Sequence, residues 1–244
     1  MKSPRLLPPV RLPAPPWRGS SRAARLYRAA LASLGPSRWW PAETPLEVCA
    51  GALLAQNTSW RGASRAVKNL EEAGLLKHPG ALLAVPAHEL EDLVRPSGYF
   101  RQKARRLRIF FQWLLEECGG EVEGLAALPL EEARASLLRL EGIGPETADS
   151  ILCYGAGKTV FVVDAYTRRI GDRHGLFPGN LPYEEIRSWF ESRLPPDLAL
   201  YREFHALLVR IGAGWCKTRP LCRGCPLSRF KKPGLGTGKE GKTR

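Results

Sequence analysis

The sequence lacks the features of a membrane or exported protein. It contains no run of about 18 apolar residues, the length that a membrane-spanning helix needs. The stretch MKSPRLLPPVRLPAPPWRGSS at residues 1–21 is basic, but prolines interrupt its apolar residues, so it does not form the apolar region of a signal peptide. We therefore predict a disordered arm over residues 1–21 and a cytoplasmic location.

Cysteine is scarce and unevenly placed. Three of the six cysteines crowd into residues 216–225, and the other three stand in apolar helical contexts. Because no export signal is visible, the crowded three favour a local metal site in a reducing compartment over a disulfide framework. Free buried cysteine is common in apolar surroundings, so Cys49, Cys118 and Cys153 are assigned no role.

Acidic residues are too few to balance the basic ones. Lys and Arg number 37 against 24 Asp and Glu, which gives a formal net charge of +13. This excess favours a polyanionic partner, with nucleic acid as the first candidate and a solvated basic surface as the alternative. The stretch after Cys225 is rich in Gly and Lys, and residues 231–244 are predicted to form a flexible basic tail.

Strand patterns are scarce too, whereas helical periodicity recurs over residues 23–211. Residues 130–138, for example, carry an apolar stripe behind Pro129. Only VFVV at residues 160–163 could pass for a strand, and it has no obvious partner, so we interpret it as a buried connector. A hydrophobic content of 44% is enough for a core, and the predicted fold class is all-α.

The stretch LEGIG at residues 140–144 joins two helical patterns. Gly142 and Gly144 permit positive φ and a close approach of backbone to a ligand, and Pro145 suits the first turn of a helix predicted over about 146–156. Exposed N–H groups at a helix N-terminus form an anion site, so a phosphate could lie there. A plain turn between two helices is the alternative.

A single acidic residue, Asp164, directly follows VFVV and can cap the next helix. Four apolar residues before it indicate poorly solvated surroundings. There a carboxylate can stabilise developing positive charge or activate water. Capping alone is the structural alternative, and the two roles are compatible.

The stretch LEGIGPETADSILCYGAG, followed by VVDAYTRRI, resembles the helix-hairpin-helix and aspartate signature of the endonuclease III superfamily of DNA glycosylases. The resemblance extends from about Trp39 to Cys225 and includes LLAQNTSW and the cysteine run. It implies two helical lobes with the active site between them. It also implies that Asp164 assists cleavage of the N-glycosidic bond.

The resemblance also implies a domain organisation. Residues 44–158 would form a helical barrel lobe with the helix-hairpin-helix at 129–156. Residues 22–43 and 159–230 would form a lobe built from both ends of the chain, with the cysteine loop at its C-terminal side.

Glu146 departs from the pattern of the bifunctional members, in which a lysine stands eighteen residues before the aspartate. That lysine attacks the sugar, forms a Schiff base and then cuts the strand by elimination. A glutamate cannot form an imine, so we expect a monofunctional enzyme without AP lyase activity. Lys158 is the nearest downstream lysine, and it lies beyond the predicted helix.

The stretches SRWWPAETPLE, LLAQNTSW and VRPSGYFRQKARRL resemble the 3-methyladenine branch of the superfamily. This resemblance implies that Trp40, Pro41 and Trp60 hold the extruded base; Trp39 is a further candidate, with core packing as its alternative. Stacking a cationic alkylated purine on an indole adds a cation–π contribution of about 0.5–2 kcal/mol. From spacing alone, the tryptophans are core anchors more often than pocket walls.

The resemblance also implies residues that contact DNA. Gln56 would fill the gap left by the flipped nucleotide, and the hairpin would bind phosphate. The expected DNA-binding residues are Gln56, Asn57, Gly142, Ile143, Gly144, Glu146, Thr147 and Arg105. A dense basic patch is predicted after Tyr99 and Phe100, where Arg105 and Arg108 could follow the DNA backbone; a solvated helix face is the alternative. Its members are Arg101, Lys103, Arg105, Arg106 and Arg108.

The run containing Cys216, Cys222 and Cys225 resembles the C-terminal iron–sulfur loop of the superfamily, in which four cysteines hold a [4Fe–4S] cluster. The first interval here is five residues instead of six, and the fourth cysteine, expected near Lys231, is missing. Three thiolates with an outside ligand, zinc with a nearby histidine such as His205, and a vestigial loop all remain open.

Together these features predict a monomeric, nucleoid-associated glycosylase of base excision repair. Its substrate would be double-stranded DNA with a flipped alkylated purine of the 3-methyladenine type, and its product an abasic site. One alternative is a glycosylase for oxidised pyrimidines or mismatched bases. The other is a noncatalytic helix-hairpin-helix DNA-binding protein.

Overall fold

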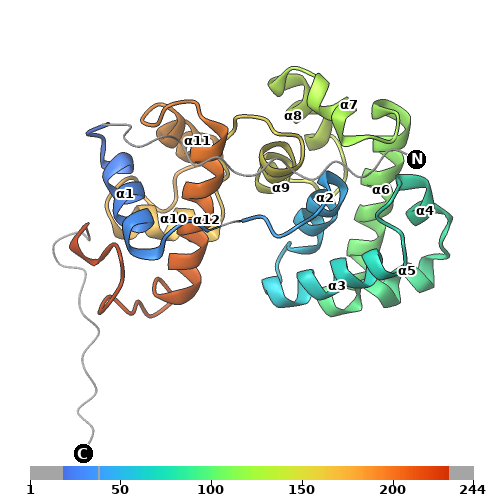
Figure 1. Cartoon of the computed structure of the whole chain (residues 1–244), viewed down its shortest axis with the longest axis horizontal. Helices are drawn as coiled ribbons and strands as arrows, with labels where there is room; N and C mark the ends of the chain where they lie inside the picture. The colour runs from blue at the N-terminus through green and yellow to red at the C-terminus, as the bar shows by residue number, and fades with distance from the viewer. Residues whose placement is uncertain (1–18, 38, 231–244) are drawn as a thin grey trace, which may run out of the picture. The chain divides into compact units, whose positions relative to one another are not determined.

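The computed structural model describes residues 19–37 and 39–230, and within them every regular element is helical (Figure 1). The predicted all-α fold class is therefore confirmed. The predicted tail, and all but the last three residues of the predicted arm, lie outside the described residues. None of the described helices has both the length and the apolar character required to cross a membrane.

The chain divides into two compact units. Unit 1 comprises residues 40–158, and unit 2 comprises the described residues of 19–39 together with 159–230. The sequence analysis placed the first boundary four residues later, after residue 43.

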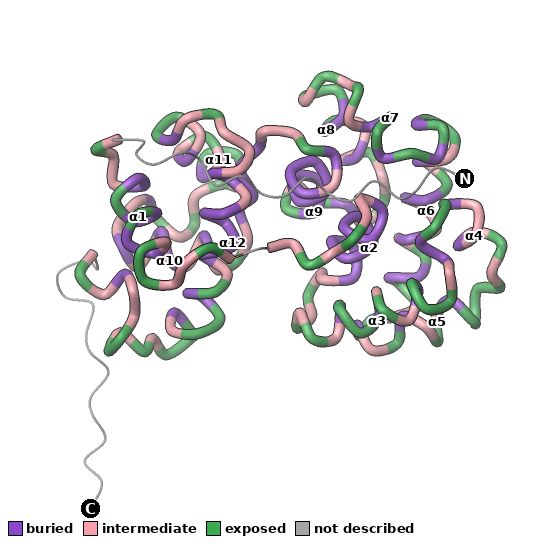
Figure 2. Tube along the Cα trace, viewed as in Figure 1, coloured by how far each residue is buried: buried purple, intermediate pink, exposed green. Residues whose placement is uncertain are grey.

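Unit 1 packs its short helices against α2, which is almost wholly buried, and against the longer α6, which buries one face (Figures 1 and 2). The elements of unit 1 are α2 (Pro45–Leu54), α3 (Trp60–Glu72), α4 (Pro79–Ala84), α5 (Ala87–Val94), η1 (Arg95–Ser97), α6 (Phe100–Cys118), α7 (Val122–Ala127), α8 (Leu130–Leu138), α9 (Pro145–Ser150) and η2 (Ile151–Gly155). Thr44 caps α2, which is apolar on all sides and almost wholly buried.

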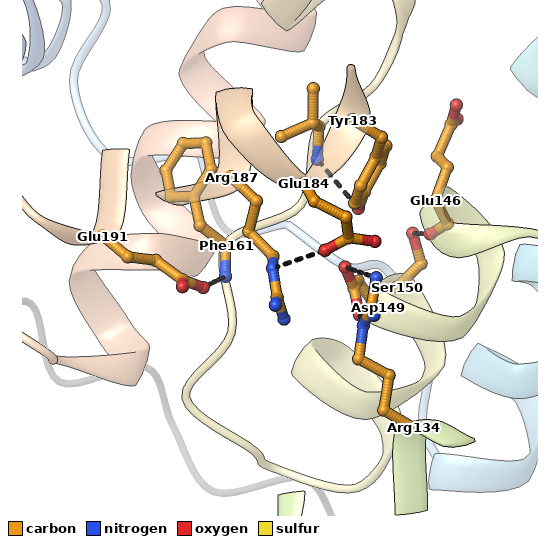
Figure 3. A network of polar contacts seen from close by, with 10 residues as sticks. Arg134, Glu146, Asp149, Ser150, Phe161, Tyr183, Glu184, Arg187 and Glu191 are labelled. Carbon is orange, nitrogen blue, oxygen red and sulfur yellow. Dashed lines mark hydrogen bonds and ion pairs between the residues drawn. The ribbon is translucent and has the colours of Figure 1, made fainter. Parts of the chain in front are cut away.

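The predicted helix-hairpin-helix is formed by α8, the turn after it, and α9. Helix α8 ends at Leu138, and Gly142 takes the positive φ of 84° that the turn requires. Helix α9 passes into a π-helical turn, η2. A buried ion pair joins the two helices, with Arg134 Nε 2.7 Å from Asp149 Oδ1 (Figure 3).

Unit 2 packs its helices around a cluster of aromatic rings. Its elements are α1 (Arg22–Leu34), α10 (Ala165–Arg173), α11 (Tyr183–Glu191), α12 (Leu198–Gly214) and η3 (Ser228–Phe230). Phe161 and Phe190 stack with their ring centroids 4.2 Å apart, and Phe204 meets both rings edge-on.

The stretch VFVV crosses this core as the buried connector that its pattern indicated. All four residues are buried and belong to neither helix nor strand. Side chains of α11 satisfy its backbone: Phe161 N–H donates to Glu191 Oε1, and Val163 N–H donates to the Tyr183 hydroxyl (Figure 3). A buried segment with satisfied backbone hydrogen bonds therefore directly precedes Asp164.

Candidate active site and DNA-binding elements

Asp164 is the N-cap of α10, and its carboxylate also stands in a poorly solvated place. Its Oδ1 accepts the N–H of Thr167 at 2.7 Å, which satisfies one of the free donors of the helix start. The side chain is only 12% exposed. Oδ1 therefore serves as the helix cap. Because the carboxylate is largely removed from water, its electrostatic interactions with nearby charges are stronger than they would be in solvent.

His205 of α12 lies beside this carboxylate, with its Nε2 3.9 Å from Asp164 Oδ2. Burial lowers the pKa of His205, although the negative charge of Asp164 acts in the opposite direction. The imidazole is consequently neutral at pH 7. At that distance and in that state it does not neutralise Asp164 as a cationic partner would.

The hairpin holds Gln56 through a compact polar network. Gln56 Nε2 donates to the Gly142 carbonyl and to Thr147 Oγ1, each at 2.9 Å. The Arg106 guanidinium donates to Gln56 Oε1. A Cβ on Gly142 would lie 2.2 Å from Arg106 Nε. Glycine is therefore required there by both the turn and the network.

Lys103 points inward and joins two loops of unit 1. It is 1% exposed, and its Nζ donates to the Leu54 carbonyl at 2.8 Å and to the Ser97 carbonyl at 2.5 Å. Burial lowers the pKa of Lys103 to about 8, with a smaller contribution from the charge of Arg106.

Each of these two loops carries a residue in the left-handed region. Asn57 has φ 50° and Tyr99 has φ 46°, and they are the non-glycine residues with positive φ in the described parts of the chain. Such strain persists where the surroundings enforce it, and it clusters at binding sites. The Tyr99 side chain is 70% exposed, which is unusual for a large aromatic residue. The sequence analysis assigned Tyr99 no role.

The predicted basic patch does not exist as one surface. Lys103 is buried, Arg106 is engaged with Gln56, and the Arg108 guanidinium donates to the carbonyls of Leu83 and Val85. The Arg108 side chain supports the α4–α5 connection, which does not favour the expectation that it follows a DNA backbone.

Two arginines of the predicted patch are exposed. Arg105 pairs with Glu141 of the hairpin, with Nη2 and Oε2 2.6 Å apart, and Arg101 lies 3.6 Å from Glu91. Exposed pairs of this kind exchange readily with other anions.

Trp40 forms an aromatic cluster with Trp60 and Tyr154 in unit 1. The Trp40 ring meets the Trp60 ring edge-on at 5.1 Å and the Tyr154 ring at 5.3 Å. Gly51 permits this packing, since a Cβ there would lie 3.1 Å from the Trp40 ring. Pro41 is exposed next to the cluster.

The division of the chain falls between Trp39 and Trp40, so Trp39 belongs to unit 2 and the cluster belongs to unit 1. Tyr154 was missed by the sequence analysis, although it stands inside the quoted hairpin signature.

No lysine occupies the position that the bifunctional pattern requires. Glu146 is exposed in the first turn of α9, where its backbone carbonyl accepts the Ser150 hydroxyl at 2.7 Å (Figure 3). The Lys158 Nζ donates to the Leu128 carbonyl at 2.6 Å. Lys158 thus serves the fold of unit 1.

Cys216, Cys222 and Cys225 line one pocket of unit 2 together with Arg173 and His174. All three are free thiols, and no set of three His, Cys, Asp or Glu side chains within residues 19–37 and 39–230 is drawn together in metal-binding geometry. Two guanidinium groups hold the loop: Arg169 Nε donates to the Cys216 carbonyl at 2.6 Å, and Arg173 Nη1 to Cys216 Sγ at 3.3 Å.

His205 does not line this pocket, because α12 directs it to Asp164 instead. Its suggested role as a zinc ligand is therefore not supported by the geometry.

Residues 50–196 match the HhH-GPD superfamily of base excision DNA repair proteins, which covers more than half of the chain. The chain belongs to this family. A Methanocaldococcus jannaschii protein, itself only provisionally assigned as a DNA repair glycosylase, is 41% identical over 208 residues, covering 84% of this chain and 94% of the relative. Endonuclease III of Thermotoga maritima is 33% identical over 197 residues, covering 79% and 86%.

Solved structures agree with this assignment. The H. pylori 3-methyladenine DNA glycosylase bound to 1,N6-ethenoadenine is 28% identical with a TM-score of 0.67, covering 78% of this chain and 95% of that chain. A noncovalent endonuclease III–DNA complex, at 23% identity and a TM-score of 0.72 over 85% and 92%, shares the fold. The protein is a DNA-binding glycosylase of base excision repair.

Proposed function

We propose that the protein is a monofunctional DNA glycosylase that hydrolyses the N-glycosidic bond of flipped, alkylated purines and leaves an abasic site. The observation that carries the proposal is Glu146, which stands where a Schiff-base lysine stands in bifunctional relatives. Glutamate offers no amine, and Lys158 is bound to a backbone carbonyl. Without an enzyme amine, water is the nucleophile.

Asp164 performs the chemistry in this proposal. As the bond between C1′ and the base breaks, its electron pair goes to the base, and the sugar develops positive charge that the carboxylate stabilises. A water oxygen bonds to C1′, and Asp164 accepts the proton that the water loses. Burial lowers the pKa of the nearby His205 and so disfavours a cationic imidazole beside the carboxylate.

The aromatic cluster of Trp40, Trp60 and Tyr154 is the proposed holder of the base, with Pro41 beside it. An alkylated purine carries positive charge, so an electron-rich ring surface favours it over a normal base by about 0.5–2 kcal/mol. The same charge makes the base a good leaving group, since it departs neutral. The similarity to an H. pylori protein named as a 3-methyladenine glycosylase supports this substrate class.

Recognition of the duplex is assigned to the strained loops and the hairpin of unit 1. Flipping a nucleotide leaves a gap in the stack, and in this proposal Gln56, with Asn57, fills it from a loop that the hairpin supports. The exposed ring of Tyr99 is suited to stack on an unpaired base. Gly142, Ile143 and Gly144 would approach a phosphate.

Incubation of the purified protein with methylated duplex DNA tests the proposal. Free base is scored by chromatography, and strand breaks are scored before and after alkali. We expect base release with strands that break only after alkali treatment. Breaks that arise without alkali would overturn the monofunctional assignment.

A second candidate is a glycosylase for oxidised pyrimidines, which the 33% identity to an endonuclease III favours. A panel of duplexes that carry single alkylated purines, oxidised pyrimidines or mismatches separates the two.

We further propose that one chain acts alone on double-stranded DNA in the cytoplasm. Sedimentation of the complex with a short duplex would check that one chain binds one duplex.

A further inference from the structure

Lys103 is a buried cation of unit 1 that the proposed reaction does not use. It lies on the buried face of α6, and its Nζ donates to the Leu54 carbonyl at 2.8 Å and to the Ser97 carbonyl at 2.5 Å. Of the residues that the structure describes, no Asp or Glu forms an ion pair with it, and the positive charge of Arg106 further disfavours its charged form. An apolar side chain of similar length would fill this space at a smaller desolvation cost. What the ammonium adds is a pair of directed hydrogen bonds.

Both acceptors of Lys103 are the last residues of helical segments. Leu54 ends α2, and Ser97 ends η1. The carbonyls of a last helical turn lack partners within the helix and lie at the negative end of its dipole, so a cation there is favourable. A single ammonium on a third helix, α6, therefore binds the ends of two others.

The chain leaves each of these two ends through a left-handed residue. Asn57 follows α2 with φ 50°, and after η1 Gly98 at φ 66° is followed by Tyr99 at φ 46°. This conformation is unfavourable for a residue with a Cβ, and it persists only where surrounding contacts impose it. The two hydrogen bonds of Lys103 fix the backbone just ahead of each strained residue.

A backbone contact also brings the two segments together. A Cβ on Gly62, in the first turn of α3, would lie 2.5 Å from the Pro96 carbonyl oxygen of η1, so the close approach requires glycine. Helix α3 follows the loop of residues 55–59, and η1 precedes the loop of residues 98–99. The two loops are therefore held near each other twice, by Lys103 at their starts and by the contact between α3 and η1.

We propose that Lys103 is a positioning residue for DNA recognition, which holds the loops of residues 55–59 and 98–99 at a fixed separation so that they enter a damaged duplex together. The ligand is the gap that a flipped nucleotide leaves in the base stack. Gln56 from the first loop and the exposed ring of Tyr99 from the second must both match the spacing of the stacked bases, and a misplacement of about 1 Å loses much of such contact. The inference rests on the proposed function only in requiring a flipped nucleotide, whichever base leaves.

Binding titrations of the full-length protein with two DNA probes test the proposal. One probe is an undamaged duplex, and the other is the same duplex with a stable abasic-site analogue, which presents a gap in the stack. We expect the wild type to prefer the gapped duplex, and Lys103→Met to reduce this preference by about 5- to 100-fold, the contribution of one base–aromatic stack. Affinity for the undamaged duplex should stay within about twofold, because phosphate contacts dominate it.

Arg108→Met is the matched control. Arg108 is another cation of α6, and its guanidinium donates to the carbonyls of Leu83 and Val85, which belong to neither loop. This variant should keep the wild-type preference for the gapped duplex, and thermal melting shows how far each variant is destabilised. An unchanged preference in Lys103→Met would overturn the proposal. So would an equal weakening of both duplexes by folded Lys103→Met, or an equal loss of preference in Arg108→Met.

Hydrogen exchange of the free wild-type protein decides the question if Lys103→Met does not fold. Loops that share one buried tie should open together, so the amides of residues 55–59 and 98–99 should show a common protection. Unrelated exchange rates in the two loops would contradict the proposal.

The proposed reaction fails separately from this inference. A wild type that releases no alkylated base but prefers the gapped duplex would refute the reaction and support the positioning role. A wild type without that preference would overturn the positioning role, whatever base it releases.

Discussion

Unit 1 and unit 2 differ in their main functional features: unit 1 has strained backbone in two loops, and unit 2 has a poorly solvated carboxylate. Unit 1 holds two exposed loops in strained backbone conformations, tied together by the buried ammonium of Lys103. Unit 2 presents one carboxylate, Asp164, from a stiff aromatic core. Under the proposed function, unit 1 would contact and deform the DNA, and Asp164 of unit 2 would act on the glycosidic bond.

Two aspartates show the same contrast on a smaller scale. Asp149 is fully buried and ion-paired with Arg134, so its charge belongs to the fold. Asp164 keeps 12% exposure and lies beside His205, whose pKa burial lowers, and the proposed function assigns it the chemistry.

The largest effect is expected from Asp164→Asn. Asparagine caps a helix about as well as aspartate, so the free energy of unfolding should change by less than about 1 kcal/mol. Base release should fall by a factor of about 10²–10⁴, because the group that stabilises the sugar and accepts the proton is gone. Chromatographic assay of released base and thermal melting check the two parts. Undiminished release would leave Asp164 as a cap alone.

Asp149→Asn should show the opposite pattern. Breaking a buried ion pair leaves the Arg134 charge uncompensated and costs about 3–5 kcal/mol of stability. Base release per folded molecule should stay near the wild-type value. Urea denaturation, with activity normalised to the folded fraction, checks this, and a loss of activity in fully folded protein would remove the distinction between the two acids.

The lowered pKa of Lys103 leads us to expect that the stability of unit 1 depends on pH. Its pKa is about 8 in the folded protein and ordinary, near 10.5, in the unfolded chain, so between these values the unfolded chain binds more protons. The stability of the wild type relative to Lys103→Met should therefore rise from pH 8 to 10.5 and stay constant below pH 8. The rise is on the order of 3 kcal/mol. Denaturation of both proteins across this range measures it, and a flat difference would contradict the lowered pKa.

The two hairpin glycines provide the smallest effect. Gly142→Ala places a Cβ at positive φ and against Arg106, and should cost about 1–3 kcal/mol and weaken DNA binding through Gln56. Gly144 has φ −93° and open space around its Cβ position, so Gly144→Ala should cost less than about 1 kcal/mol. Melting and duplex-binding titrations of both variants check the pair, and equal losses would show that the turn is not the cause.

The all-α class and the helix-hairpin-helix could be predicted from the sequence, because helical periodicity and turn residues depend on neighbouring positions in the chain. The buried connector before Asp164 followed directly from four apolar residues with no partner strand. Lys103 was misplaced in a basic patch, although it falls on the apolar face of α6 with Leu107, Phe110 and Leu114, at helical spacing. The sequence analysis counted the basic residues of this helix without asking which helix face each one occupies, and so missed that Lys103 is buried.

The histidines could not be sorted from sequence. His205 lies eleven residues before the cysteine run and was a natural candidate for a metal ligand, whereas His174 lies far upstream. Helix α12 directs His205 to Asp164, and only the packing of unit 2 brings His174 beside the cysteines. Contacts between distant segments are set by tertiary packing.

Borohydride trapping tests the central claim most directly. Wild-type protein and a lysine-dependent bifunctional glycosylase are each incubated with their damaged duplex and sodium borohydride, which reduces any Schiff base to a stable adduct. The account predicts that this protein releases base and forms no covalent adduct with DNA, while the reference enzyme does. A reduced adduct between this chain and DNA would contradict it.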